Sequence, residues 1–415
     1  MVLEKYSIGV GDRFGHQGRA QLDAVIRAKA NGADIVPVWN KSFREHNIIG
    51  TTPKDTRLEA DEAAGACNWQ GSYYVDADHI NLNNVETFIE CSDFFTLDVA
   101  DYIGRSASAD EVDAFVEYCR KYTGTLEIPG IEASFDITEE SIRQVAEKFL
   151  NAVKEAGKIY RHIVSARGGD DLITEVSTDE SDQPQTPVEM FFILAAIAQE
   201  KIPAQTIAPK FTGRFNKGVD YVGDVAAFEK EFNEDIAVIK FAIDEFDLPG
   251  NLKLSVHSGS DKFSIYGPIN MALKKFDAGL HLKTAGTTWL EELIGLALAG
   301  GDGLTIAKEI YGKSLEKFDM LCAPYATVID IDRAKLPTPA EVDDWDGETY
   351  AANLRHDQSC GLYNLHFRQL LHVGYKVAAD MGAGYLDALK KYEEQIAENV
   401  TENIYERHLK PLFVD

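Results

Sequence analysis

The sequence predicts an α/β protein: a closed (β/α)8 barrel of the TIM type with additional C-terminal helices. The first observation is an alternation of short apolar runs with amphipathic segments along 415 residues. With about eight repeats in order, this alternation is typical of a parallel sheet, either closed as a barrel or open and doubly wound. The second observation favours the closed form, because no G-x-G-x-x-G motif follows an early strand, and "GVGDRFG" matches that fingerprint poorly.

Each expected strand is a short apolar run that ends in polar residues. The strands are expected at 6–12, 34–40, 73–82, 94–101, from 171 onward, and at 204–211, 252–260 and 279–287. The clearest helices, with apolar residues at helical spacing, cover 21–32, 110–122, 138–157, 225–246, 267–276 and 288–301. Beyond about residue 310 the pattern is less regular and ends in long helical stretches. We therefore expect a single catalytic domain over 1–415, with a barrel core at about 5–310 and a C-terminal helical extension at about 311–415.

The charge balance excludes some partners. The chain has 41 basic and 68 acidic residues, a formal net charge of −27. Such a surface repels nucleic acid and anionic lipid, so neither is expected as a partner. The five cysteines are widely spaced and form no Cys-x-x-Cys pair, which argues against disulfides and zinc knuckles. No long apolar run or cleavage signature is present, so a cytoplasmic protein is expected; a homo-oligomer stays open.

Polar residues at the ends of the expected strands carry the chemistry. In a barrel these positions face the active-site mouth. In chain order they are Asp12, Asn40, Asp76, Asp78, His79, Asp98, Asp101, Glu175 to Glu180, Lys210, His257 and Lys283. Two imidazoles with carboxylates resemble a divalent-metal set of the zinc, manganese or nickel type, and two lysines resemble an anion-binding set. Together they indicate a metal-assisted reaction on a small acidic, oxygen-rich substrate.

Each of these residues also has a purely structural interpretation. Asp78 could cap a turn, and Asp224 could be only the N-cap of the helix that starts at residue 225. A single histidine after a strand is more often hydrogen-bonded than a ligand, but two histidines at strand ends, His79 and His257, favour ligation. Lys210 and Lys283 could pair with neighbouring acids in so acidic a protein.

Four stretches resemble the tagaturonate epimerase family of bacterial hexuronate catabolism. They are "YVDADHINL", "APKFTGRFNKGVDYVGD", "SVHSGSDKFSIY" and "KTAGTTWLEELIGLA". The resemblance extends from about residue 5 to residue 380. It implies a divalent-metal-dependent epimerase that interconverts D-tagaturonate and D-fructuronate.

The reaction that the resemblance implies inverts a carbon β to a ketone, whose C–H bond is not acidified by the carbonyl. A retro-aldol route avoids this difficulty, because a base removes the hydroxyl proton, the C–C bond breaks, and the aldehyde fragment rotates before the bond re-forms. The hypothesis is that His79 and His257 ligate the metal, with Asp220 or Asp224 as the carboxylate ligand. The remaining expected roles are Asp78 as base, Glu180 as acid, and Lys210 and Lys283 as cations for the substrate carboxylate or the enolate.

One feature of this hypothesis depends on local geometry. Consecutive strand residues point to opposite faces, so Asp78 and His79 can reach one site only if the strand ends or bulges there. In a regular strand, Asp76 would share the face of Asp78 and become the rival carboxylate.

Other functions remain open from the sequence. A metal-dependent aldolase or a sugar isomerase would use the same mouth, metal and enediolate. A glycoside hydrolase needs two opposed carboxylates and does not require the histidines or lysines. A non-catalytic sugar-acid binding protein would leave the metal-type side chains unexplained.

Overall fold

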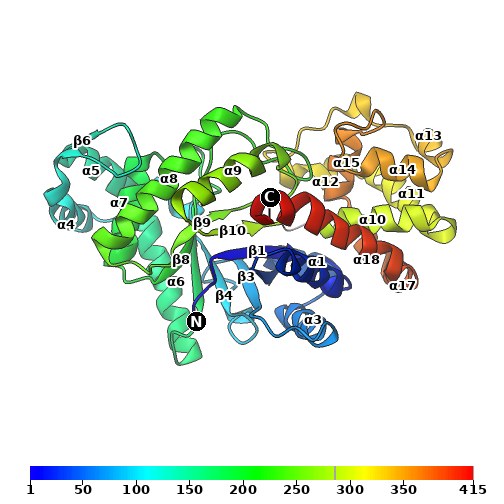
Figure 1. The fold of residues 1–415 in the computed structure, drawn as a ribbon, viewed down its shortest axis with the longest axis horizontal. Helices are drawn as coiled ribbons and strands as arrows, with labels where there is room; N and C mark the ends of the chain where they lie inside the picture. The colour runs from blue at the N-terminus through cyan, green and yellow to red at the C-terminus, as the bar shows by residue number, and fades with distance from the viewer. Residues whose placement is uncertain (285–286, 415) are drawn as a thin grey trace.

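Eight parallel strands form a closed barrel in the computed structural model, which describes residues 1–284 and 287–414 (Figure 1). Around the barrel the strand order is β1-β10-β9-β8-β7-β4-β3-β2. The barrel strands are β1 (Tyr6–Gly11), β2 (Ile35–Asn40), β3 (Tyr74–Ile80), β4 (Phe94–Asp98), β7 (Ile173–Ser177), β8 (Ala204–Ala208), β9 (Lys253–Val256) and β10 (Leu280–Lys283). The predicted (β/α)8 barrel is therefore confirmed, and each of its strands lies within or beside a run predicted from the sequence.

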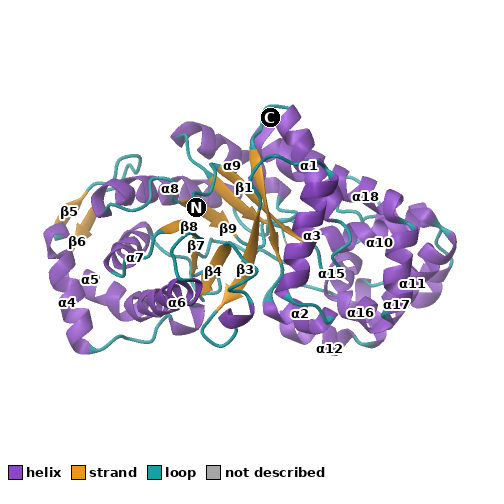
Figure 2. Cartoon of the chain, turned by 90° about the horizontal axis from the view of Figure 1, so that it is seen from below, coloured by secondary structure: helices purple, strands orange, loops and turns teal. Residues whose placement is uncertain are grey.

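The helices that follow the strands have clear local causes. They are α1 (Gly18–Ala30), α2 (Phe43–Ile49), α3 (Pro53–Ala66), α4 (Ala109–Cys119), α5 (Glu139–Val145), α6 (Asn151–Arg167), α7 (Pro187–Gln199), α8 (Val225–Phe246) and α9 (Phe263–Phe276). Helix α7, for example, begins with Thr186 and Glu189 in a reciprocal capping box and with Pro187 in its first turn. Of these, α1, α3, α6, α7, α8 and α9 stand around the outside of the barrel (Figure 2).

An excursion between β4 and β7 was only partly predicted. It contains α4, the antiparallel pair β5 (Gly124–Leu126) and β6 (Phe135–Ile137), and α5, which continues through a π-helical turn into α6. The sequence indicated the helices but not the short hairpin, whose strands are only three residues long. In both overall views this excursion lies on one side of the barrel and the C-terminal helices lie on the other (Figures 1 and 2).

The C-terminal helices do two things. Most of them form a separate layer beside the barrel: α10 (Thr287–Ala299), α11 (Gly301–Glu316), α12 (Phe318–Cys322), α13 (Pro339–Asp343), α14 (Gly347–Leu354), α15 (Leu365–Val373), α16 (Tyr375–Met381), α17 (Ala383–Lys391) and α18 (Glu393–Glu402). The last segment, the π-helical η7 (Asn403–Val414), returns to the barrel and packs against α1 and α9. Phe413 contacts Tyr6 of β1 with ring centroids 4.9 Å apart, so the end of the chain covers the first strand.

The barrel interior changes character along its axis. Its N-terminal end holds a small apolar cluster that includes Val36, Tyr74, Phe94 and Ile173. Two larger apolar clusters pack the helices onto the outside of the sheet. Toward the C-terminal ends of the strands, the interior side chains become charged and include Asp76, Glu175 and Lys283. No helix among the described residues is long and apolar enough to cross a membrane.

Candidate active site

The strand that carries Asp78 and His79 is bulged. The pairing of β3 with β4 shifts register between Ala77 and Ile80, and His79 has a left-handed backbone with φ of 53°. For a residue with a side chain, this conformation costs about 1–2 kcal/mol. The bulge breaks the alternation of faces, so Asp78 and His79 both line the cavity at the barrel mouth.

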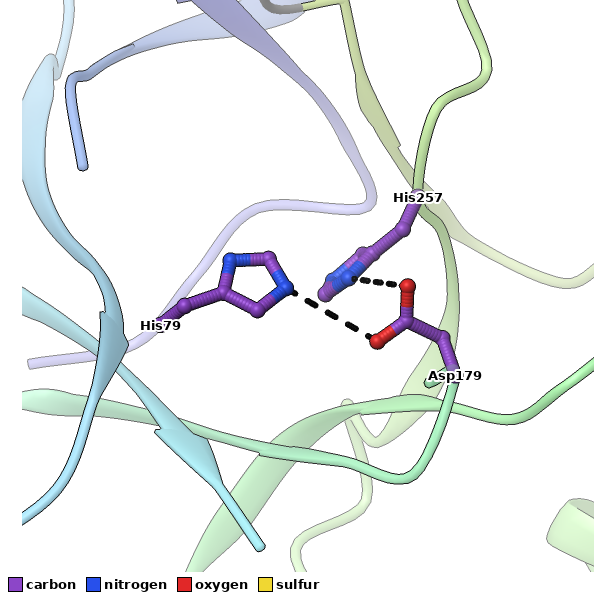
Figure 3. A group of neighbouring side chains, drawn as sticks. All are labelled: His79, Asp179 and His257. Carbon is purple, nitrogen blue, oxygen red and sulfur yellow. Dashed lines mark ion pairs between the residues drawn. The ribbon is translucent and has the colours of Figure 1, made fainter. Parts of the chain in front are cut away.

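Three side chains from three different strand ends meet in this cavity (Figure 3). His79 lies near the end of β3, Asp179 in the loop after β7, and His257 directly after β9. One ligand atom from each lies within 4.8 Å of the other two. His257 Nδ1 is 3.2 Å from Asp179 Oδ2, and His79 Nε2 is 3.7 Å from Asp179 Oδ1. This group could hold a metal ion.

Two further carboxylates fix how the imidazoles face this group. His79 Nδ1 donates to Asp78 Oδ1 at 2.8 Å, and His257 Nε2 donates to Glu175 Oε1 at 2.7 Å. These bonds leave Nε2 of His79 and Nδ1 of His257 turned toward Asp179. A carboxylate behind each imidazole is the arrangement that orients histidine ligands in metal sites.

Lys283 neutralises the carboxylates behind the histidines. Its ammonium lies 2.9 Å from Asp76, 3.0 Å from Asp78 and 3.1 Å from Glu175. Burial opposes the charged lysine, but the three carboxylates outweigh it and raise the pKa of Lys283. Burial likewise favours a neutral Asp78, yet Lys283 and His79 outweigh it and lower the pKa of Asp78. Lys283 therefore neutralises the carboxylates on which the two histidines rest, and its predicted role as a substrate-binding cation stays a prediction.

The structure corrects the placement of two predicted metal ligands. Asp224 accepts hydrogen bonds from the backbone N–H groups of Ala226 and Ala227, as the N-cap of α8. Asp220 accepts hydrogen bonds from Ser264 in the first turn of α9. Neither carboxylate lies beside the two histidines, and Asp179 takes that position instead.

Asp179 carried no distinguishing signal in the sequence. It lies in the polar stretch "STDES", within the run from Glu175 to Glu180, and the sequence suggests a specific role only for its neighbour Glu180. Nothing in that loop shows which carboxylate points inward, because loops have no side-chain period. The one available clue was its position two residues after the end of β7.

The mouth cavity has a volume of about 630 Å³. The group of His79, Asp179 and His257, called the metal-type group below, lines this cavity. Five cationic side chains line it as well: Arg44, Lys210, Arg214, Lys217 and Lys283. Glu180 also lines the cavity, and burial raises the pKa of its carboxyl group. Lys210 lines the cavity as well, and its backbone N–H donates to Gln185. The cavity can therefore receive a small, polar, anionic molecule.

The donor set fits a divalent cation. Two imidazole nitrogens and one carboxylate are typical ligands for zinc and related ions. His257 Nδ1 is buried and makes no hydrogen bond to any described residue, although Asp179 Oδ2 lies 3.2 Å from it. Burial disfavours a charged His79, but Asp78 and Asp179 outweigh it and raise the pKa of that imidazole. The surroundings of the group thus favour positive charge at this point.

A parallel eight-stranded barrel with a polar, metal-type group at the C-terminal mouth defines a (β/α)8-barrel enzyme. A sequence profile of the tagaturonate epimerase family matches residues 1–412. The chain therefore belongs to the tagaturonate epimerase family, and it is a carbohydrate epimerase, an isomerase.

Individual relatives agree with this assignment. The tagaturonate/fructuronate epimerase of Thermotoga maritima is 28% identical over 421 residues, covering 97% of this chain and 80% of that protein. The native crystal structure of the fructuronate-tagaturonate epimerase from Cohnella laeviribosi superposes with a TM-score of 0.81 at 25% identity, covering 99% of this chain and 82% of that chain. A glycerol complex of the same enzyme gives the same TM-score at 24% identity, with 99% of this chain and 82% of that chain covered, and supports the fold.

Proposed function

We propose that this protein interconverts D-tagaturonate and D-fructuronate with the help of a divalent cation. The observation that carries the proposal is the group formed by His79, Asp179 and His257 at the barrel mouth of a tagaturonate epimerase family member. The names of the relatives from Thermotoga maritima and Cohnella laeviribosi supply the substrate pair. The acidic substrate agrees with the cationic side chains that line the cavity.

The proposed route is a retro-aldol cleavage followed by aldol bond formation. The inverted carbon lies β to the ketone, so removing its hydrogen directly would give an unstabilised carbanion. Removing the hydroxyl proton instead allows the adjacent C–C bond to break, giving an aldehyde and an enediolate. A divalent cation held by His79, Asp179 and His257 would supply Lewis-acid stabilisation of the negative charge.

Glu180 is the best candidate for proton transfer. It lines the cavity, and burial raises the pKa of its carboxyl group, which makes the carboxylate a stronger base. In the proposed route it accepts the hydroxyl proton before cleavage and returns it to the alkoxide after the bond re-forms. This assignment combines the base and acid roles that the sequence divided between Asp78 and Glu180.

Asp78 has a different role in this proposal. Its carboxylate bonds to both His79 and Lys283, and its lowered pKa makes it a weak base. Asp78 instead orients His79, as Glu175 orients His257. Since the two orienting carboxylates share Lys283, one buried lysine holds both imidazoles in place.

The experiment is conversion of D-tagaturonate in D₂O, followed by NMR. The protein is stripped with a chelator and then supplied with Zn²⁺, Mn²⁺ or Ni²⁺. The proposal expects metal-restored D-fructuronate without deuterium at the inverted carbon. Deuterium at that carbon would reject C–C cleavage, and free three-carbon products would indicate an aldolase. No conversion with any of the metals would reject the proposed function.

A further inference from the structure

The cations that line the mouth cavity are not equally available to a substrate. Lys283 already contacts three carboxylates. The exposed Arg214 pairs with Asp330 at 3.4 Å. Arg44 donates to the Tyr325 hydroxyl at 3.1 Å and stacks over its ring. These three side chains therefore have partners within the protein.

Lys217 differs from them. Its ammonium donates to the Ser258 hydroxyl at 2.7 Å, and no carboxylate lies within ion-pair distance of it among the described residues. Ser258 directly follows His257, so this bond places the ammonium beside the metal-type group. Burial lowers the pKa of Lys217, while the charges of Asp179, Glu45 and Glu180 act in the opposite direction. A substrate anion would supply the partner that this side chain lacks.

The backbone around Lys217 is held by a second buried lysine. Lys262, with 1% of its surface exposed, donates to three carbonyl oxygens. They belong to Asn216 at 2.9 Å, Val219 at 2.7 Å and Ser260 at 2.8 Å. The first two carbonyls flank Lys217 in the chain, and the third follows Ser258. Lys262 therefore fastens together the two loops whose side chains meet in the Lys217–Ser258 bond.

A buried arginine from the C-terminal helices completes this support. Arg368 of α15 donates to the carbonyl of Gly218, and its guanidinium lies 3.0 Å from Asp261. Gly218 has φ of 71°, and a Cβ there would lie 3.1 Å from the His372 ring. The segment that carries Lys217 is thus fixed on both sides by hydrogen bonds from two buried basic side chains, Lys262 and Arg368.

We propose that Lys217 binds the carboxylate of the substrate and that Lys262 is a positioning residue for it. The inference rests on the proposed function, because it assumes a ketouronate. In a ketouronate the carboxylate and the ketone lie on opposite sides of the bond that the retro-aldol step breaks. The carboxylate therefore stays with the aldehyde fragment after cleavage. An ammonium fixed beside the metal-type group retains that fragment while its aldehyde group rotates to present its other face.

The first test compares K217M, K217R and K210M in steady-state conversion of D-tagaturonate. K217M is expected to raise KM about 10- to 100-fold, the effect of losing one charge-assisted contact, with kcat changed by less than about tenfold. K217R keeps the positive charge, so its KM is expected to lie close to that of the wild type. A rise below about threefold in K217M, or a larger rise in K210M, would overturn the proposal. Absence of turnover by the wild-type enzyme would instead reject the proposed function.

The second test is a double-mutant cycle between Lys217 and Lys262. K262M alone is expected to raise KM, as K217M does. The KM of the K217M/K262M double variant is expected to be less than about three times that of K217M. If the fold-increase in KM of the double variant equals the product of the two single fold-increases, Lys262 does not act through Lys217. Melting temperatures and metal content separate this effect from loss of fold, and K262R serves if K262M does not fold. The comparison of K217M, K217R and K210M tests whether Lys217 binds the substrate carboxylate, whether or not the Lys262 variants fold.

Discussion

Replacing Lys283 by Met tests the charge balance among the buried carboxylates at the bottom of the site. The substitution leaves Asp76, Asp78 and Glu175 buried without the ammonium that lies 2.9–3.1 Å from them. Breaking a buried ion pair by removing one partner costs about 3–5 kcal/mol. The three pairs share one cation, so their costs do not add. We expect K283M to lose about 3–5 kcal/mol of unfolding free energy near pH 8.

The loss should depend on pH in a defined direction. In the wild type, Lys283 lowers the pKa of Asp78 and Glu175, so their stabilisation is present above about pH 4 and is lost as pH falls through the lowered values. Without Lys283, only His79 still opposes the burial of Asp78 and only His257 and His281 that of Glu175, so the pKa values of both carboxyl groups rise relative to the wild type. The folded variant then binds protons as pH falls from 8 toward 5, so its loss of unfolding free energy relative to the wild type becomes smaller.

Urea unfolding at pH 5, 6.5 and 8 measures both effects. The matched control is K313M, which removes an exposed lysine that pairs with Glu309 on the same helix and is expected to cost about 0.3–0.5 kcal/mol. A deficit for K283M of less than about 1 kcal/mol at pH 8, or a deficit that grows toward pH 5, would refute this reasoning.

Three further outcomes follow from the described contacts. A divalent cation at about 100 times its Kd should stabilise the wild type by about 2.7 kcal/mol in thermal melts and D179N by much less; equal stabilisation would contradict the assigned ligand. D224A should cost about 1 kcal/mol in urea unfolding and D224N almost nothing, because Asn is also a good N-cap, whereas equal losses would contradict the cap. Burial raises the pKa of Asp235, whose Oδ1 has no hydrogen-bond partner among the described residues, so wild-type stability falls as pH rises from about 4 through the raised value. D235N should therefore be more stable than the wild type by about 1–3 kcal/mol at pH 8 and less so at pH 5; no gain at pH 8 would count against this assignment.

The barrel could be predicted from the sequence because its strands are buried on both faces. Runs such as 35–40 and 204–208 are fully buried, and parallel strands of this kind read as nearly continuous apolar segments. The expected strands at 204–211 and 252–260 ran past the observed ends at Ala208 and Val256. The expected strand at 279–287 ran past Lys283, and its residues 285 and 286 lie outside the described part of the chain. The return of η7 to α1 and α9 could not be predicted, since it is a contact between distant segments.

The site was predictable where a polar side chain stands at the end of a strand. His79 lies near the end of β3 and His257 directly after β9, the two side chains meet, and Lys283 of β10 contacts the carboxylates that hold them. The bulge at His79 was recognised as a requirement, but only the register shift with β4 establishes it. The carboxylate of the group was missed because loop conformation decides between Asp179, Asp220 and Asp224.

The central claim is that His79, Asp179 and His257 hold the divalent cation that epimerisation requires. The most direct measurement is the rate of D-tagaturonate conversion by stripped enzyme as a divalent metal is titrated, in the wild type, D179N and D224N. The account predicts that D224N follows the wild-type curve, while D179N needs at least about 100-fold more metal for half-maximal rate. Superimposable curves for all three proteins, or conversion without added metal, would contradict it.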